Sequence, residues 1–254
     1  MIRFFKGKSI LLKTLPFVIG IVLMKYAFYM FGFEFVELNA LFTAFVAANV
    51  FLLGFLMAGV LTDFKESEKL PGELSVSLES IADEARMLYK TKKLKEAKEC
   101  LEHIQAFILC LKEWFYKKER TRTVFGRLSE LNAFFAAFEP HTQANFIVRL
   151  KQEQTNIRRI VTRVDAIRDT SFISSGYRIA EVNSILLIIG LVALKIEPLT
   201  YALFLIGSVS LLFIYMMFLI KDLDDPFGFS STDSFENVSI KAIEDLGERL
   251  KSFD

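Results

Sequence analysis

The sequence predicts an all-α membrane protein, with four transmembrane helices in two hairpins and a large cytoplasmic helical domain between the hairpins. Two observations lead to this fold class. The composition is 53% hydrophobic and 24% charged, with a mean hydropathy of +0.38, which is more apolar than an ordinary soluble domain. The apolar residues also gather into four stretches, whereas residues 63–180 contain most of the charges and are rich in helix formers.

Each transmembrane helix is predicted from its length and apolar content. A spanning helix needs about 20 mostly apolar residues, because each adds about 1.5 Å and the hydrocarbon core is about 30 Å thick. The first two spans are predicted at Leu15 to Phe33 and Leu38 to Thr62, and the fourth at Leu199 to Ile220. The third span is shorter. Its apolar part runs from Ile185 to Leu194, so it reaches spanning length only if it begins near Ile179.

The connections and the basic residues predict the topology. Residues 34–37 and 195–198 are short connections, so each pair of spans is predicted to form a hairpin. Residues 1–14 contain four basic groups and no acid, and arginines also precede the third span. By the positive-inside rule, both flanks lie in the cytoplasm. We therefore expect a multi-pass protein of the cell (plasma) membrane with both termini cytoplasmic.

The central segment is predicted to form about four helices. No β-like alternation is present, and helix starts are expected near Pro71 and near Thr142. The resulting division of the chain is as follows: a cytoplasmic N-terminal segment (1–14), a first transmembrane hairpin (15–62), a cytoplasmic helical domain (63–178), a second transmembrane hairpin (179–220) and a cytoplasmic C-terminal tail (221–254).

Several classes of function lack their usual sequence signals. The chain has no P-loop, no dinucleotide-binding glycine fingerprint, no H-E-x-x-H zinc motif and no G-x-S-x-G nucleophile elbow. His103 and His141 are the only histidines, and Cys100 and Cys110 the only cysteines, so neither a metal cluster nor a disulfide framework is predicted. We expect no enzyme activity, no cofactor and no nucleic-acid partner.

Two short motifs near opposite ends of the chain resemble those of one membrane-protein family. The second span contains Phe51-Leu52-Leu53-Gly54-Phe55, and Glu68-Lys69-Leu70-Pro71 follows it. After the last span comes Asp224-Asp225-Pro226-Phe227-Gly228. Together with the four-span topology, these segments resemble the F-x-L-G-F, E-x-L-P and D/N-P-F-G motifs of the bestrophin family. The motifs cover about 35 residues, and the central domain shows no alignable motif.

The resemblance implies a homopentameric ion channel, usually chloride-conducting, whose second span (38–62) is a pore helix lining a central neck. Ala47, Phe51 and Phe55 are spaced i, i+4, i+8, so they share one helix face, which also includes Thr43 and Gly59. A ring of such faces would form two stacked collars of phenyl groups. Hydrophobic constrictions gate by dewetting, and aromatic ring edges can face an anion without holding it tightly.

Two charged residues complete the set of pore-lining candidates. Asp63 and Phe64 stand where animal bestrophins have a basic residue and tryptophans, so selectivity between anions and cations stays open. Lys25 lies near the middle of the first predicted span, where a charge costs about 2.5–3.5 kcal/mol. Lys25 is predicted either to attract anions near an outer vestibule or to snorkel or pair with a neighbour.

The acidic residues after the last span are the only candidate metal ligands. They are Asp224, Asp225, Asp233 and Glu236. Calcium-sensing bestrophins have a run of consecutive acids at this point, and calcium takes six to eight oxygen ligands. Residues 229–232 are Phe-Ser-Ser-Thr here, so we expect no high-affinity calcium site. An acidic run beside a membrane is more often a solvated linker or a partner for basic residues.

The main alternative is a membrane-anchored scaffold or receptor whose cytoplasmic helical domain binds a partner. That function requires no ion flux, and it predicts that replacing Phe51 and Phe55 costs packing alone. A channel instead has inorganic ions, the lipid bilayer and further copies of itself as partners, and the same replacement is expected to raise or deregulate flux.

Overall fold

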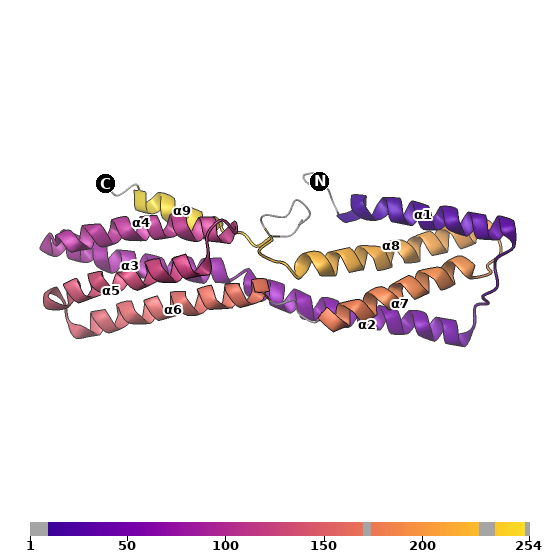
Figure 1. Cartoon of the computed structure of the whole chain (residues 1–254), viewed down its shortest axis with the longest axis horizontal. Helices are drawn as coiled ribbons and strands as arrows, with labels where there is room; N and C mark the ends of the chain where they lie inside the picture. Colours follow the sequence, from indigo (N-terminus) through magenta and orange to yellow (C-terminus); the bar gives the residue numbers. More distant parts are fainter. Residues whose placement is uncertain (1–9, 170–173, 229–236, 252–254) are drawn as a thin grey trace. The chain divides into compact units, whose positions relative to one another are not determined.

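The computed structural model describes residues 10–169, 174–228 and 237–251 (Figure 1). Helices make up the regular structure of these residues, and the described part of the chain has no β-strand, only an isolated bridge between Val36 and Leu194. The elements are α1 (Ile10–Phe31), α2 (Ala40–Ser67), α3 (Leu70–Lys92), α4 (Lys95–Phe115), α5 (Thr121–Phe138), the 3-10 turn η1 (Glu139–His141), α6 (Ala144–Asp169), α7 (Ser174–Ala193), α8 (Leu199–Leu223) and α9 (Lys241–Lys251).

The predicted all-α membrane class is confirmed. α1, the segment that begins with α2, α7 and α8 are each long and apolar enough to cross a bilayer. The chain divides into two compact units. The membrane unit comprises residues 1–63 and 171–224, and the helical unit comprises residues 64–170 and 225–254.

In the membrane unit, α1 packs along α8 and also contacts α7, and α7 in turn contacts α8 (Figure 1). The predicted first hairpin is therefore not seen as a packed pair, because α1 finds its neighbours in the later helices. The connection from α1 to α2 covers residues 32–39 rather than 34–37. Val36 joins the α1–α2 connection to the α7–α8 connection through two hydrogen bonds. The Val36 N–H donates to Ala193 O (3.1 Å), and the Val36 carbonyl accepts from the Lys195 N–H (2.8 Å).

The end of α1 is set by a glycine. Gly32 has φ +69, and the N–H of Phe33 donates to the Phe28 carbonyl at 2.9 Å. The Gly32 N–H also donates to Tyr29 O at 3.2 Å, which completes a Schellman cap. A residue with a side chain is strained in this left-handed conformation, so glycine is the natural terminator.

Two spans begin earlier than predicted. α1 begins at Ile10 rather than Leu15, because the Thr14 hydroxyl is buried and satisfied within the helix by the Leu11 carbonyl (2.8 Å). α7 begins at Ser174 rather than Ile179, so its first turns include polar residues. A hydroxyl bonded to its own helix backbone costs little in an apolar setting, which is why the apolar stretch alone understates the helix.

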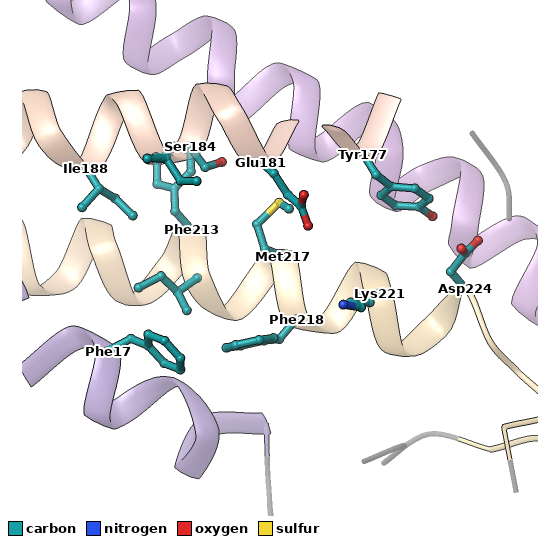
Figure 2. Close-up of a pocket in the computed structure, with 12 residues that line it drawn as sticks. Phe17, Tyr177, Glu181, Ser184, Ile188, Phe213, Met217, Phe218, Lys221 and Asp224 are labelled. Atoms are coloured by element: carbon teal, nitrogen blue, oxygen red, sulfur yellow. The ribbon is translucent and has the colours of Figure 1, made fainter. Parts of the chain in front are cut away.

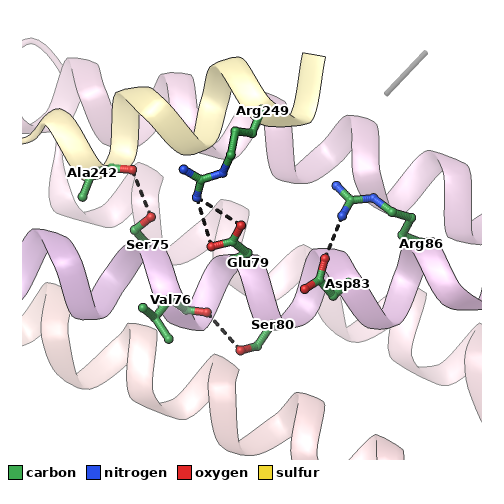
Figure 3. Close-up of polar contacts among 8 residues, drawn as sticks. All are labelled: Ser75, Val76, Glu79, Ser80, Asp83, Arg86, Ala242 and Arg249. Carbon is green, nitrogen blue, oxygen red and sulfur yellow. Dashed lines mark hydrogen bonds and ion pairs between the residues drawn. The ribbon is translucent and has the colours of Figure 1, made fainter. Parts of the chain in front are cut away.

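The helical unit contains the four predicted central helices, α3 to α6, which begin close to the expected positions. It also contains α9, which the sequence analysis had assigned to a tail. α9 packs on α3 and α4 through its buried residues Ile243, Leu246 and Leu250. Figure 3 shows its polar contacts with α3: Arg249 forms a two-pronged ion pair with Glu79 (3.0 Å), and Ser75 donates to Ala242 O (3.0 Å).

Candidate functional site

The candidate site is built on α2, and its first turn is fixed by a side-chain cap. Asn39 precedes the helix, and its Oδ1 accepts a hydrogen bond from the Phe42 N–H at 2.9 Å. This satisfies one of the backbone donors that a helix start leaves unpaired. The Thr43 hydroxyl donates to the Asn39 carbonyl at 3.1 Å. The helix then continues without a break to Ser67.

α2 has one buried face and one exposed face. The buried residues recur at steps of three and four: Asn49, Leu53, Leu56 and Val60. On the other side, Phe51 is 76% exposed and Phe55 60% exposed, although both are large apolar side chains. Their exposed neighbours are mostly small: Thr43, Ala44, Ala47, Ala48, Gly54, Ala58 and Thr62. Leu41 and Val50, at the margins of this side, are the larger exposed residues. We call this surface the Phe51 face.

The structure places Ala47, Phe51 and Phe55 together on the exposed side, where the i, i+4 spacing put them. Gly59 lies at the margin and is half-buried. The sequence analysis missed Thr62 as part of this face. Its position was readable from spacing, because eleven residues after Phe51 is just over three full turns. Thr62 is exposed, and its hydroxyl donates to the Ala58 carbonyl at 2.9 Å.

Asp63 lies off the Phe51 face. At about 100° per residue, it is about 120° around the helix from Phe51. It is half-buried and interacts electrostatically with Tyr177 of α7. Asp63 is therefore not part of the Phe51 face, and its role as a pore-lining residue near the cytoplasmic mouth stays a prediction.

Lys25 is paired within its own chain, and its role as a pore-lining residue stays a prediction. Its side chain is fully buried, and its ammonium group donates to the backbone carbonyls of Val192 (3.3 Å) and Leu194 and to the Glu34 carboxylate. The carbonyls at the end of α7 lack partners within their own helix, and that end has partial negative charge. Of the alternatives for Lys25, pairing with a neighbour is the one that the structure shows.

The buried face of α2 approaches α7 closely at one glycine. A Cβ atom at Gly190 would lie 2.9 Å from Cε2 of the Phe42 ring. That distance is shorter than ordinary van der Waals contact, so the ring occupies the space that a side chain at residue 190 would need. Gly190 thus allows the first turn of α2 to lie against α7.

Residues 225–228 of the second motif belong to the helical unit, and Pro226, Phe227 and Gly228 are buried. Phe227 is fully buried, with its ring centroid 5.7 Å from that of Phe115. The turn before it is tight: the Gly228 N–H donates to the Asp225 carbonyl at 3.1 Å, and a Cβ at Gly228 would lie 2.7 Å from Asp225 Oδ2. The Val238 N–H donates to Pro226 O at 2.9 Å. These contacts make the motif an anchor for the segment that leads to α9.

Arg168 holds the other side of this aromatic cluster. Its guanidinium lies 4.6 Å from the Trp114 ring centroid and donates to the carbonyls of Trp114 (2.8 Å) and Phe115 (2.6 Å), at the end of α4. Burial lowers the pKa of Arg168 from its ordinary value, and Asp165 partly opposes that shift. The Trp114 indole N–H donates to Thr121 Oγ1 (3.0 Å), whose hydroxyl donates to Asp165.

The candidate metal ligands do not come together in the described residues. Asp224 ends α8 in the membrane unit, whereas Asp225 belongs to the helical unit and lies 3.9 Å from Lys117 Nζ. Asp233 and Glu236 lie outside the residues that the structure describes. Within the described ranges, no group of three or more His, Cys, Asp or Glu side chains has an arrangement that suits a metal ion.

No family model and no curated protein matches the sequence. Solved structures do match over almost the whole chain. A variant of a bacterial bestrophin homologue from Klebsiella pneumoniae superposes with a TM-score of 0.78 at 13% identity, covering 96% of this chain and 98% of that chain. A second variant gives 0.76 at 16% identity and covers 98% of each chain. A further structure of the homologue gives 0.73 at 15% identity and covers 96% of each chain.

Proposed function

Because the chain has the fold of the bacterial bestrophin homologues, we propose that it is the subunit of an oligomeric ion channel that conducts ions passively through a central pore. The Phe51 face of α2 forms the hydrophobic neck of this pore, with Ala47, Phe51 and Phe55 at the constriction. The observation that carries the proposal is the exposure of Phe51 and Phe55 on a helix whose opposite face is buried.

The composition of the Phe51 face favours a pore over a surface turned to lipid. The exposed residues of α1 illustrate a lipid-facing surface, since they are nearly all large: Phe17, Ile19, Leu23, Met24 and Met30. On α2, two phenylalanines instead lie among alanines and a glycine. Small residues allow helices to approach closely in a membrane, so the Phe51 face suits contact with copies of the same helix. The phenyl rings then project where the copies converge.

α2 has one face that its own chain leaves exposed, and the described membrane unit of one chain encloses no path for ions. The proposed channel is therefore an assembly of several copies. Five copies follow from the bestrophin resemblance. The basic residues before the first and third spans favour cytoplasmic termini, and the plasma membrane is the expected location.

We propose chloride as the conducted ion. The positive edges of ten phenyl rings, two from each of five subunits, would face a permeating anion without desolvating it completely. The position of Asp63 away from the Phe51 face supports anions, because its carboxylate does not oppose them there. Conduction is proposed to need no cofactor and no high-affinity calcium site.

The test is ion flux from liposomes that contain the purified protein. Chloride and then potassium efflux are measured for the wild type and for Phe51→Ala/Phe55→Ala. Flux is expected to rise several-fold in the double variant, because removing both collars widens and wets the neck. The matched control is Phe204→Ala/Leu212→Ala, which removes two exposed side chains from α8 and is expected to leave flux unchanged.

Either of two outcomes would contradict the channel. The first is that well-folded wild type and double variant both pass neither ion, which would favour the scaffold or receptor. The second is that the α8 control raises flux as much as the α2 variant, which would show a leak from disturbed packing. A higher potassium than chloride flux would instead retain the pore and overturn anion selectivity.

A further inference from the structure

A pocket of about 690 Å³ lies in the membrane unit between α1, α7 and α8 (Figure 2). It is separate from the Phe51 face, because no α2 residue lines it. Its apolar walls include Phe17, Ile188, Phe213, Met217 and Phe218. A concave apolar site of this volume is within the usual range for ligands, about 300–1,000 Å³. At membrane depth, walls of this kind suit the acyl chain of a lipid.

One buried polar atom in the wall has no partner. Ser184 is only 5% exposed, and within the described chain its hydroxyl makes no hydrogen bond. Helical serines at comparable sites usually bond to their own backbone, as Thr14 does here. An unsatisfied buried hydroxyl costs free energy, so the Ser184 Oγ is a donor available to a ligand with an ester or phosphate oxygen.

The pocket is polar at one end only. There, the first turns of α7 and the last turns of α8 contribute Tyr177, Glu181, Lys221 and Asp224. Among the described residues, neither the Glu181 carboxylate nor the Lys221 ammonium has an ion-pair partner, and both are exposed. The polar end therefore presents charges of both signs beside an apolar body, which is the charge pattern that complements a zwitterionic head group.

We propose that this pocket binds one phospholipid with an ammonium-bearing zwitterionic head group. Its acyl chain lies along Phe213 and Phe218, its phosphate is paired by Lys221, and its ammonium is paired by Glu181. Ser184 donates to an oxygen of the glycerol-ester region. The site sits on α1, α7 and α8, so a bound lipid would contact all three of these helices.

The proposal is tested by native mass spectrometry of the full chain, purified in detergent with equal amounts of phosphatidylethanolamine and phosphatidylglycerol. The wild type is expected to retain phosphatidylethanolamine preferentially. Glu181→Gln removes the partner of the ammonium and is expected to reduce that preference about tenfold, the effect of one charge-assisted contact. Lys221→Gln is expected to weaken retention of both lipids, because both have a phosphate.

The chain supplies matched controls at the other end of the same helices. Glu197→Gln and Lys195→Gln make the same charge changes on exposed residues of the α7–α8 connection, away from the pocket, and are expected to leave retention unchanged. Ser184→Leu keeps every charge but fills the wall, and it is expected to abolish retention. The thermal midpoint of each variant separates loss of the lipid from loss of the fold.

The inference is overturned if the wild type retains neither lipid, since a neighbouring subunit rather than a lipid would then cover the pocket. It is also overturned if the Glu181, Lys221 and Ser184 variants retain the lipids as the controls do, which would show adventitious annular lipid only. Neither result depends on ion flux, so the proposed channel is tested separately.

Discussion

Phe51 and Phe227 belong to the two motifs that resemble those of the bestrophins, yet their surroundings are opposite. Phe51 is 76% exposed on a membrane helix, whereas Phe227 is fully buried against Phe115 in the helical unit. Both side chains are identical in size and apolarity. The difference is that Phe51 has few packing partners within its own chain, whereas Phe227 is enclosed by its own chain.

This contrast separates function from stability. Replacing a side chain that has no packing partner in its own chain removes few contacts, so its effect is expected on conduction and assembly. Replacing one that is enclosed leaves a cavity and is expected to act on the fold. Four measurements test this contrast, and they are given in order of decreasing expected effect.

The largest effect is expected from Phe227→Ala. It removes a buried ring and is expected to lower the free energy of unfolding by about 3–5 kcal/mol. Denaturant titration of the detergent-solubilised protein, followed by circular dichroism, measures it. Phe55→Ala deletes the same ring from the Phe51 face and is the control, with an expected change of about 0.5 kcal/mol or less. Equal destabilisation by the two variants would show that Phe55 and Phe227 contribute equally to stability, and the contrast between the two motifs would be wrong.

Arg168→Met is expected to cost about 1.5–3 kcal/mol, because it leaves the carbonyls of Trp114 and Phe115 without their charged donor. The thioether keeps much of the apolar contact with the cluster, so packing alone is changed little. Trp114 is the only tryptophan of the chain, and its emission therefore reports this cluster during unfolding. Arg168→Lys keeps the charge but loses the planar stacking on the Trp114 ring. Its free energy of unfolding should lie between those of the wild type and Arg168→Met. If the unfolding midpoint of Arg168→Met equals that of the wild type, the hydrogen bonds of Arg168 do not stabilise this cluster. Packing alone would then hold Phe227 against Phe115.

The features that the sequence predicted correctly are those that depend on the pattern of neighbouring residues. The apolar run Leu199 to Ile220 fixed the last span, and the spacing of Ala47, Phe51 and Phe55 placed them on one face. Both follow from helix geometry, which is a property of neighbouring residues. The resemblance in turn anticipated a fold that the solved structures share at 13–16% identity.

The contacts that were missed join distant parts of the chain. Lys25 is bound by the carbonyl of Val192, 167 residues later, and no spacing rule connects them. α9 lies within the predicted C-terminal tail (221–254). Eleven residues form only a marginal helix in isolation, so α9 is stabilised by docking on α3 and α4, which no local pattern indicates. Asp63 is a pore-lining candidate because of its position after the second span. Its interaction with Tyr177 of α7 could not be predicted from that position.

A third measurement concerns how the buried face of α2 supports the exposed one. Gly190→Ala places a methyl group 2.9 Å from the Phe42 ring and is expected to cost about 1–3 kcal/mol through overpacking. The second substitution Phe42→Ala makes room for the methyl group, so the double variant should recover part of the loss in a double-mutant cycle. Additive costs would show that α2 and α7 adjust independently and that the Phe51 face is not positioned by this contact.

The effect that is smallest per pH unit is expected from the pH dependence of the helical unit, which tests how completely its core is enclosed. Burial raises the pKa of the Cys100 thiol from 9.0 to about 12. The unfolded chain loses this proton near pH 9 while the folded chain keeps it. The thiol therefore contributes stability that is complete below pH 9 and is lost as pH rises toward 12, at up to about 1.4 kcal/mol per pH unit.

Comparing the pH slopes of wild type and Cys100→Ala isolates this contribution, because all other titrating groups are common to both. The wild type should lose stability more steeply above pH 9. Cys110, on the same helix but only half-buried, supplies the internal reference: iodoacetamide at pH 8 should alkylate it well before Cys100. Alkylation of both thiols at one rate would mean that the core opens as readily as the surface. The contrast between an enclosed helical unit and an uncovered Phe51 face would then be lost.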